Sequence, residues 1–130
     1  MVIDSSAVIA ILFDEPEAEA LLSQIAVAEI CRLSAASLVE VGIVLRRDAA
    51  AQRRAAFDEM LRLFSIKIEP LTEQQAYLAL DAYDRFGKGT GHPAGLNYGD
   101  CFSYALAKQT GEALLFKGND FTRTDLESAC

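Results

Sequence analysis

Four carboxylate side chains stand where an apolar run ends or where a helix is expected to begin. Asp4 follows the apolar residues MVI, Glu40 lies in SLVEVGIVL, Asp100 lies in NYGD, and Asp120 follows EALLFK. Carboxylates gathered in one place repel one another and raise one another's pKa values unless a divalent cation neutralises them. Mg²⁺ and Mn²⁺ favour carboxylate oxygens together with retained waters and substrate phosphate. The residue types therefore indicate metal-dependent hydrolysis of a phosphate ester by an activated water.

The same acids have a second interpretation as helix caps. SLVE is a capping-box sequence, NYGD resembles one, and an acid in the first turn of a helix gains from the helix dipole. Two features favour a shared site instead. Glu40 lies in a helix that is apolar on almost every face, so its carboxylate would be largely desolvated without a cation or hydrogen-bond donors, and Asp4 interrupts an apolar run. The only histidine, His92, stands alone in a glycine-rich loop and is predicted to be a loop residue rather than a base or ligand.

The elements that must position these acids alternate along the chain. The apolar runs MVID, CRLSA, IKIEPL and EALLFKG have the length of buried strands. Helices are expected from Ser5 onward and over 15–28, 37–46, 49–64, 72–86 and 98–110. This alternation predicts an α/β fold, a three-layer sandwich with a mainly parallel sheet flanked by helices. Ligands collect outside the carboxyl ends of such strands, where Asp4 and Asp120 fall, while Glu40 and Asp100 are expected in the first turns of helices.

Length and composition predict one domain. A chain of 130 residues, 52% of them hydrophobic, is enough for a single core, and no shift in composition marks a boundary, so residues 1–130 are expected to form one domain. No apolar run reaches the roughly 18 residues of a membrane-spanning helix. No basic leader precedes the first apolar stretch, so a cytoplasmic location is expected. Cys31, Cys101 and Cys130 show no CxxC spacing and are expected to be reduced thiols.

The charge of the chain limits how it could bind nucleic acid. A formal net charge of −7 repels nucleic acid at long range, so any such contact must be local. The densest basic stretch, RRDAAAQRR over 46–54, is predicted to be the solvated face of a helix. The loop FGKGTGHPAGLN over 86–97 could be a mobile lid or a mere connection, and it lacks the spacing of a phosphate-binding loop.

Four segments of the sequence resemble a known family. VIDSSAVIAIL, SLVEVGIVL, YDRFGKGTGHPAGLNYGDCFSYALAKQTG and ALLFKGNDF, in this order, resemble PIN-domain ribonucleases and specifically the VapC toxins of bacterial type II toxin–antitoxin pairs. The resemblance spans nearly the whole chain. It implies a PIN-like fold and an RNA endonuclease whose acids, here Asp4, Glu40, Asp100 and Asp120, hold Mg²⁺ or Mn²⁺. Ser6 matches the hydroxyl that the family places near the metal waters.

The resemblance also implies partners. Such toxins form homodimers, and a small antitoxin, here of the VapB type, inhibits them by driving a segment into the active-site groove. Lys88, Lys117, Arg46 and Arg47 are candidates for phosphate contacts with the RNA, and plain surface charge is the alternative. The last short strand of the family would fall on TDLESAC, which is a poor strand former.

Three other functions fit parts of the sequence. A haloacid-dehalogenase-type phosphatase needs DxD after the first strand, where this chain has DSS. A phosphorelay receiver needs adjacent acids after the first strand and an aspartate after the third, where Glu69 and Pro70 stand. A non-catalytic PIN-like binding module would share the fold but have an inert site, and four intact acids argue against it. The binding module stays open as the main alternative, and the receiver-like switch is less favoured.

Overall fold

Four short parallel strands form the sheet at the centre of the computed structural model, which describes residues 1–130. Their order is β3-β2-β1-β4, with bounds β1 Val2–Ile3, β2 Arg32–Ser34, β3 Lys67–Glu69 and β4 Leu114–Leu115. Each neighbouring pair is parallel, and Val2 pairs with Arg32 on one side and with Leu114 on the other. The predicted α/β class with a mainly parallel sheet is therefore confirmed.

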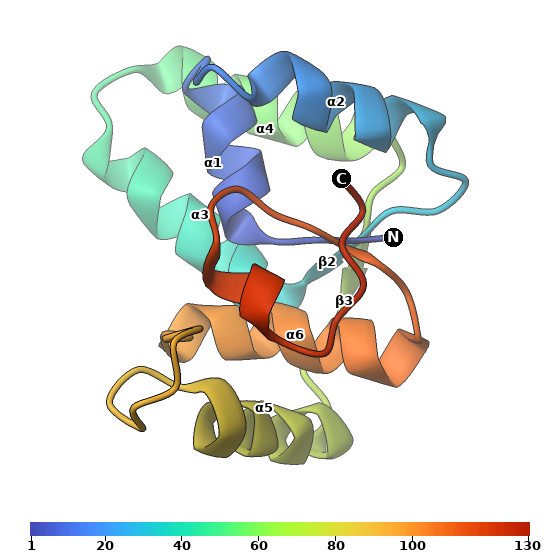
Figure 1. Cartoon of the computed structure of the whole chain (residues 1–130). Coiled ribbons are helices and arrows are strands. Elements are labelled where there is room, and N and C mark those ends of the chain that lie inside the picture. The colour runs from blue at the N-terminus through green and yellow to red at the C-terminus, as the bar shows by residue number, and fades with distance from the viewer.

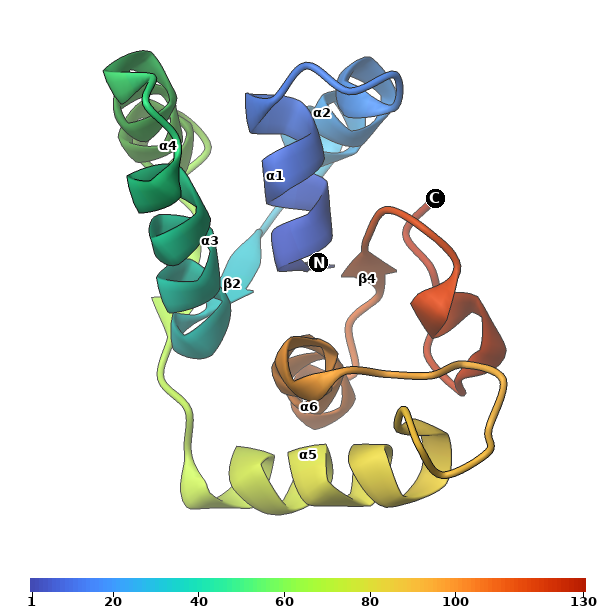
Figure 2. The same cartoon turned by 90° about the vertical axis from the view of Figure 1, so that its left-hand side faces the viewer.

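Helices cover both faces of this sheet (Figure 1, Figure 2). The helices on one face are α1 (Ser5–Leu12), α2 (Ala18–Val27), α3 (Ala35–Arg47) and α4 (Ala51–Leu63). On the other face lies α6 (Tyr98–Thr110), and α5 (Glu73–Phe86) packs against the outer side of α6, as Figure 2 shows. A short 3₁₀ helix, η1 (Asp120–Arg123), follows β4. None of these helices is both long and apolar enough to cross a membrane.

Two hydrophobic clusters fill the space between the sheet and its helices. Successive residues of a strand point to opposite faces, and accordingly Ile3 and Leu115 belong to one cluster whereas Val2 and Leu114 belong to the other. The first cluster takes side chains from α1, α2, α3 and α4, and the second from α5, α6 and Phe121 of η1. Because β1 and β4 are buried on both faces, they appear in the sequence as uninterrupted apolar runs.

The strand order reverses between β1 and β4. The chain builds the sheet in one direction from β1 through β2 to β3, and then places β4 on the other side of β1. Helix α1 leaves β1 on one face, whereas α6, which precedes β4, lies on the opposite face (Figure 2). A crevice for ligands forms at such a reversal, outside the carboxyl ends of the strands. Asp4 directly follows β1 at this point.

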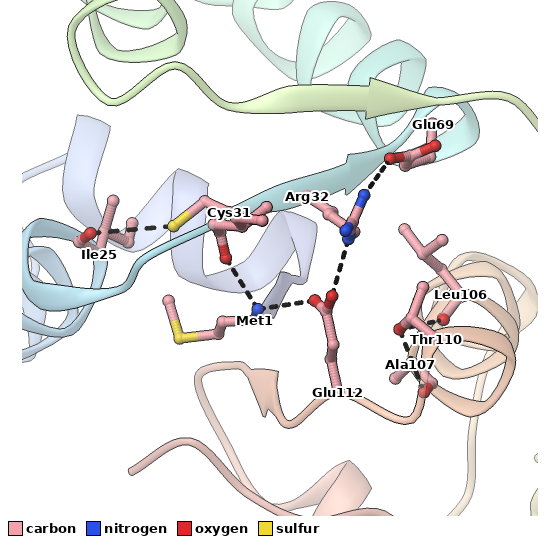
Figure 3. Close-up of polar contacts among 10 residues, drawn as sticks. Met1, Ile25, Cys31, Arg32, Glu69, Leu106, Ala107, Thr110 and Glu112 are labelled. Atoms are coloured by element: carbon pink, nitrogen blue, oxygen red, sulfur yellow. Dashed lines mark hydrogen bonds and ion pairs between the residues drawn. The ribbon is translucent and has the colours of Figure 1, made fainter.

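A separate ionic network links all four strands and contains none of the four candidate acids. Glu112, just before β4, accepts hydrogen bonds from Arg32 Nε at 2.8 Å and from the Met1 amino group at 2.7 Å (Figure 3). Arg32 Nη1 also donates to Glu69 Oε1 at 2.6 Å. These two carboxylates raise the pKa of Arg32 above its usual value. The network stabilises the sheet away from the crevice.

Three predicted helix starts are wrong by two residues or more, and one of them is that of α4, which begins at Ala51 rather than at 49. Helix α2 begins at Ala18 rather than at 15, because Pro16 lies in a turn in which Asp14 has a φ of 51° and Glu15 N–H bonds back into α1. Helix α3 begins at Ala35 rather than at 37. The bounds predicted for α6 agree with the structure. In the C-terminal segment TDLESAC only an isolated bridge to β4 forms, and all three cysteines are free, as predicted.

Candidate active site

Asp4 comes directly after β1 and caps α1. Its side chain is 1% exposed, and Oδ2 accepts a hydrogen bond from the backbone N–H of Ser6 at 3.0 Å. The other carboxylate oxygen, Oδ1, is buried and has no hydrogen-bond partner. A buried acceptor without a partner costs free energy. The cap therefore accounts for one oxygen of Asp4, and the second indicates a ligand that the chain does not itself supply.

Asp100 lies in the first turn of α6 and is 9% exposed. It forms a complete capping box with Asn97, since Asp100 N–H donates to Asn97 Oδ1 at 2.9 Å and Asn97 N–H donates to Asp100 Oδ2 at 3.0 Å. Burial raises the pKa of Asp100 to about 7, the hydrogen bond from Asn97 opposes this rise, and the charges of Asp4, Asp120 and Glu40 add to it. The fold thus brings three other acids within electrostatic reach of Asp100.

Glu40 reaches this place because α3 crosses α6 closely. Ser37 and Ser103, both buried, face each other across the crossing with 3.2 Å between their hydroxyl oxygens. In the first turn of α6, Gly99 has no side chain and leaves its space to the Glu40 carboxylate. From α1, Ser5 Oγ donates a hydrogen bond to Glu40 Oε1. Residues from α1 and α6 therefore contact this one carboxylate of α3.

Two expectations about Glu40 need correction. Ser34 caps α3, its Oγ accepting from a backbone N–H at 3.2 Å, so SLVE is not a capping box and Glu40 lies in the second turn of the helix rather than the first. The side chain is also partly exposed instead of largely desolvated. The same surface of α3 leaves Val39 and Ile43 60% and 47% exposed. The cap interpretation of Glu40 is therefore wrong.

Asp120 and Ser6 lie beyond the carboxyl ends of β4 and β1. Asp120 is exposed and begins η1, and its charge still reaches Asp100. Ser6 Oγ accepts a hydrogen bond from Lys117 N–H at 3.0 Å, which joins the start of α1 to the end of β4. The Ser6 hydroxyl thus has a main-chain partner at the crevice, and its O–H can still donate.

The two candidate lysines come from different elements. Lys117 follows β4, and its Nζ forms an ion pair with Glu15 Oε2 at 2.7 Å and lies 3.7 Å from Glu17 Oε2. Lys88 is exposed, and its backbone N–H donates to Leu96 O at 2.7 Å, beside the residues that lead into α6. Lys117 is therefore held at the crevice by acids, and Lys88 lies on the loop that leads into the helix of Asp100.

The two candidate arginines lie farther away. Arg46 and Arg47 end α3, about 10 Å along the helix axis from Glu40. Arg46 Nη1 donates to the carbonyl of Gly42 at 2.9 Å, and both side chains are exposed. Their placement agrees with the predicted solvated helix face and does not bring them to the acids. The structure also keeps His92 in its loop, where Nδ1 accepts a backbone hydrogen bond at 3.0 Å.

The available oxygens suit a hard divalent cation that keeps part of its water shell. No three acidic, histidine or cysteine side chains stand close enough together to enclose an ion by themselves. Mg²⁺ is bound in this way, through one or two carboxylates, several waters and substrate phosphates. A cation would give the unpaired Asp4 Oδ1 a partner and would offset the repulsion at Asp100. The donor set therefore fits Mg²⁺ or Mn²⁺.

Two residues that contact Glu40 were not predicted from the sequence. The sequence indicates Ser5 only as the beginning of a helix and gives no role to Gly99. A glycine inside the first turn of a helix is a weak signal that another part of the chain approaches closely. The partner of such a glycine is distant in sequence and becomes visible only once α3 and α6 are packed together.

The comparison with known families identifies the class of the protein. A family model described as PIN domain matches residues 1–127, so the chain belongs to the PIN-domain family. Within that family the chain is 53% identical over 131 residues to ribonuclease VapC28 of Mycobacterium tuberculosis (strain ATCC 25618 / H37Rv), covering 99% of this chain and 97% of that protein. It therefore belongs with the VapC ribonucleases.

Solved structures show the same fold at low sequence identity. The crystal structure of Mycobacterium tuberculosis VapC20, titled as a Sarcin-Ricin loop cleaving toxin, has a TM-score of 0.76 and 15% identity, covering 96% of this chain and 95% of that chain. A toxin–antitoxin complex from Klebsiella pneumoniae has a TM-score of 0.68 and 16% identity, covering 95% and 92%. Both likenesses confirm the three-layer PIN-like fold.

Proposed function

We propose that this protein is an RNA endonuclease that hydrolyses phosphodiester bonds and is the toxin of a toxin–antitoxin pair. Membership of the VapC ribonucleases supports the reaction class. One observation carries the proposal for this chain. Outside the carboxyl ends of β1 and β4, burial together with the charges of Asp4, Asp120 and Glu40 raises the pKa of Asp100. A buried carboxylate whose charge is disfavoured by three nearby acids is suited to holding a cation beside a phosphate.

Asp4, Glu40 and Asp100 would be the principal ligands of Mg²⁺ or Mn²⁺, either directly or through waters that the ion retains, with Asp120 in support. When bound, such an ion supplies Lewis-acid activation of water and neutralises negative charge on the phosphodiester. The chain prepares its own groups for this. A backbone N–H orients Asp4 Oδ2 and leaves Oδ1 available, and the Asn97 N–H stabilises the ionised form of Asp100 in spite of burial. No histidine or other base of the chain is needed near the reacting water.

Two lysines are the proposed contacts to RNA phosphates. Lys117 lies next to the crevice, where exchange of its pairing with Glu15 for a phosphate would bring a cation to the substrate. Lys88 is exposed on the loop before α6. Arg46 and Arg47 could contact only flanking phosphates, because they lie about 10 Å farther along α3.

The proposed partners are RNA, a VapB-type antitoxin and a second copy of this chain. The structural likeness to a toxin–antitoxin complex supports an antitoxin partner. A homodimer is supported by the apolar surface of α3 and α6, where Val39 and Tyr98 are 60% and 80% exposed. These residues line a surface hollow of about 390 Å³ together with Ile43, Leu71 and Phe102. Apolar side chains exposed in such a group are typical of protein interfaces.

The first test is Mn²⁺ binding by calorimetry at neutral pH for the parent protein and Asp100→Asn. Because the amide cannot carry the ligand charge, we expect the affinity to fall by more than about 10-fold in the variant. Asp58→Asn is the matched control, since Asp58 is an exposed acid on α4. The second measurement is cleavage of a broad RNA pool, which Asp100→Asn should abolish and the control should leave intact.

Two results would overturn the proposal. Absence of Mn²⁺ and Mg²⁺ binding in the parent, or affinity indifferent to Asp100, would leave Asp100 as a helix cap and favour a non-catalytic PIN-like binding module. RNA cleavage by Asp100→Asn at the parental rate would show that the reaction does not use this site.

A further inference from the structure

We infer that Ser5 and Gly99 are positioning residues that fix the Glu40 carboxylate for the metal site. This inference rests on the proposed function, because it takes Glu40 as a ligand. The two residues act from different elements: Ser5 begins α1, and Gly99 lies in the first turn of α6. Ser5 donates a hydrogen bond to Glu40 Oε1, and the Glu40 carboxylate occupies the space that a side chain at position 99 would take.

Glu40 needs such help more than the other two principal acids. Asp4 Oδ2 and Asp100 Oδ2 each accept a hydrogen bond from a backbone N–H at 3.0 Å. The only hydrogen bond to Glu40 comes from the Ser5 hydroxyl. Glutamate also has one more rotatable bond than aspartate and loses more entropy when its carboxylate is fixed. Without Ser5, the partly exposed Glu40 would have no donor to hold it in one rotamer.

Gly99 acts by leaving room. A Cβ atom at this position would lie 2.9 Å from Glu40 Cδ and closer still to Oε2, which is nearer than real Cβ atoms come to such neighbours. Any larger residue would therefore push the carboxylate out of its present place. The conformation of Gly99 is helical, so the requirement for glycine at this position is one of space and not of backbone freedom.

The other serines near the contact between α3 and α6 affect the position of Glu40 but do not orient its carboxylate. The Ser37 and Ser103 hydroxyls set the distance between α3 and α6 at a point one turn away. Ser6, the neighbour of Ser5, bonds to the end of β4 instead. The hydroxyls of the two serines after Asp4 thus have different partners, and only the Ser5 hydroxyl bonds to an acid side chain.

Calorimetric Mn²⁺ titrations of five variants test this inference. Removal of an outer hydrogen bond to a metal ligand weakens binding by about 10-fold or more, so we expect this loss for Ser5→Ala. Ser5→Thr keeps the hydroxyl and should restore the affinity. Gly99→Ala should weaken binding by displacing the carboxylate. In a Glu40→Gln background, Ser5→Ala should cause no further loss, because the ligand that it positions is already gone.

Ser23→Ala is the matched control. Ser23 is an exposed serine of α2 whose hydroxyl bonds to a backbone carbonyl at 2.8 Å, so its removal should leave the Mn²⁺ affinity unchanged. Circular dichroism of each variant identifies any that fail to fold. Since every reading is a metal affinity, the outcome does not depend on finding the right RNA.

The possible failures are distinguishable. If Glu40→Gln binds Mn²⁺ as well as the parent, Glu40 is not a ligand and this part of the proposed function is wrong. If Glu40→Gln weakens binding but Ser5→Ala and Gly99→Ala do not, the site stands and the positioning role is overturned. If Ser5→Ala weakens binding equally in the Glu40→Gln background, Ser5 acts on some other group and the inference is again overturned.

Discussion

Asp100 must satisfy opposing demands with one side chain. Its hydrogen bonds with Asn97 stabilise the start of α6. Its burial and the neighbouring acids disfavour the charged form, and this raises its pKa to about 7. A ligand for a cation must nevertheless be ionised. Without a cation, the folded protein therefore carries a repulsion that serves only the proposed reaction, which is the usual relation between stability and function at such sites.

Asp100→Asn is accordingly expected to stabilise the metal-free protein. The amide oxygen can still accept the Asn97 N–H, while the buried charge is removed. At pH 8 in the presence of a chelator, the midpoint of thermal unfolding should rise by about 3 °C or more, which corresponds to roughly 1 kcal/mol for a domain of this size. Differential scanning calorimetry measures the shift. Asp58→Asn should shift the midpoint by less than about 1 °C. A lower midpoint for Asp100→Asn would mean that the cap needs the charge.

At the scale of the elements, α6 holds the C-terminal segment as well as Asp100. Tyr104 Oη donates to Asp125 Oδ1 at 2.7 Å, and Lys108 Nζ donates to Asp125 Oδ2 at 2.9 Å. Partial burial of Asp125 would raise its pKa, but these two hydrogen bonds lower it to about 2. TDLESAC forms only an isolated bridge to β4. The hydrogen bonds of Asp125 therefore help to hold this segment in place against α6.

The contact predicts a pH-dependent stability. An acid with a lowered pKa stabilises the folded state above its unfolded pKa of 3.8, and this contribution is lost as the pH falls towards 2. We expect Asp125→Asn to lower the free energy of unfolding by about 1 kcal/mol at pH 6, a value reduced for solvent screening because the side chain is one-third exposed. The difference should vanish near pH 2. Urea unfolding at both pH values measures it, and a deficit unchanged at low pH would contradict the ionic origin.

The elements show which local signals suffice for prediction. The bounds of α6 follow from the sequence because Asn97 caps one end and Gly111, with a φ of 68°, ends the other. The start of α2 does not follow from the sequence, because a proline suits the first turn of a helix as well as it suits the turn in which Pro16 lies. Ser37 has the spacing of a cap, but packing against Ser103 decides its role. Local chemistry predicts an element well only where no distant contact competes with it.

The site follows the same rule. The placement of Asp4 could be predicted because it comes directly after β1, and that of Asp120 because it lies in the connection that follows β4, since parallel strands place their carboxyl ends together. The correct helix was predicted for Glu40, but its turn and its exposure were not. The contact between Glu40 and Gly99 joins residues far apart in the chain and depends on the angle at which α3 meets α6. No pattern in the sequence predicts the angle between these two helices.

For the whole molecule, the net charge of −7 must be reconciled with binding of RNA. The acids at the crevice contribute to this charge, and a bound cation would offset part of it there. Lys117 is already at the crevice but is paired with Glu15. The chain therefore has little long-range attraction for RNA, and we expect its affinity for RNA to depend on the metal and on contacts close to the cleaved bond.

A second copy of the chain would cover the apolar surface that the monomer leaves exposed. Light scattering at micromolar concentration should give twice the monomer mass of 14.1 kDa. Val39 and Ile43 lie one turn apart on α3 and are 60% and 47% exposed, so a charge at either position would be buried without a partner in a dimer. Val39→Glu and Ile43→Glu should therefore give monomers.

Val27→Glu is the control for these substitutions, because Val27 is 79% exposed on α2 and lies outside this surface. It should leave the mass of the parent unchanged. A parent that scatters as a monomer would contradict the homodimer itself. A dimer that persists in both α3 variants would place the interface on another face, and it would leave the hollow beside Glu40 open to solvent and to the RNA.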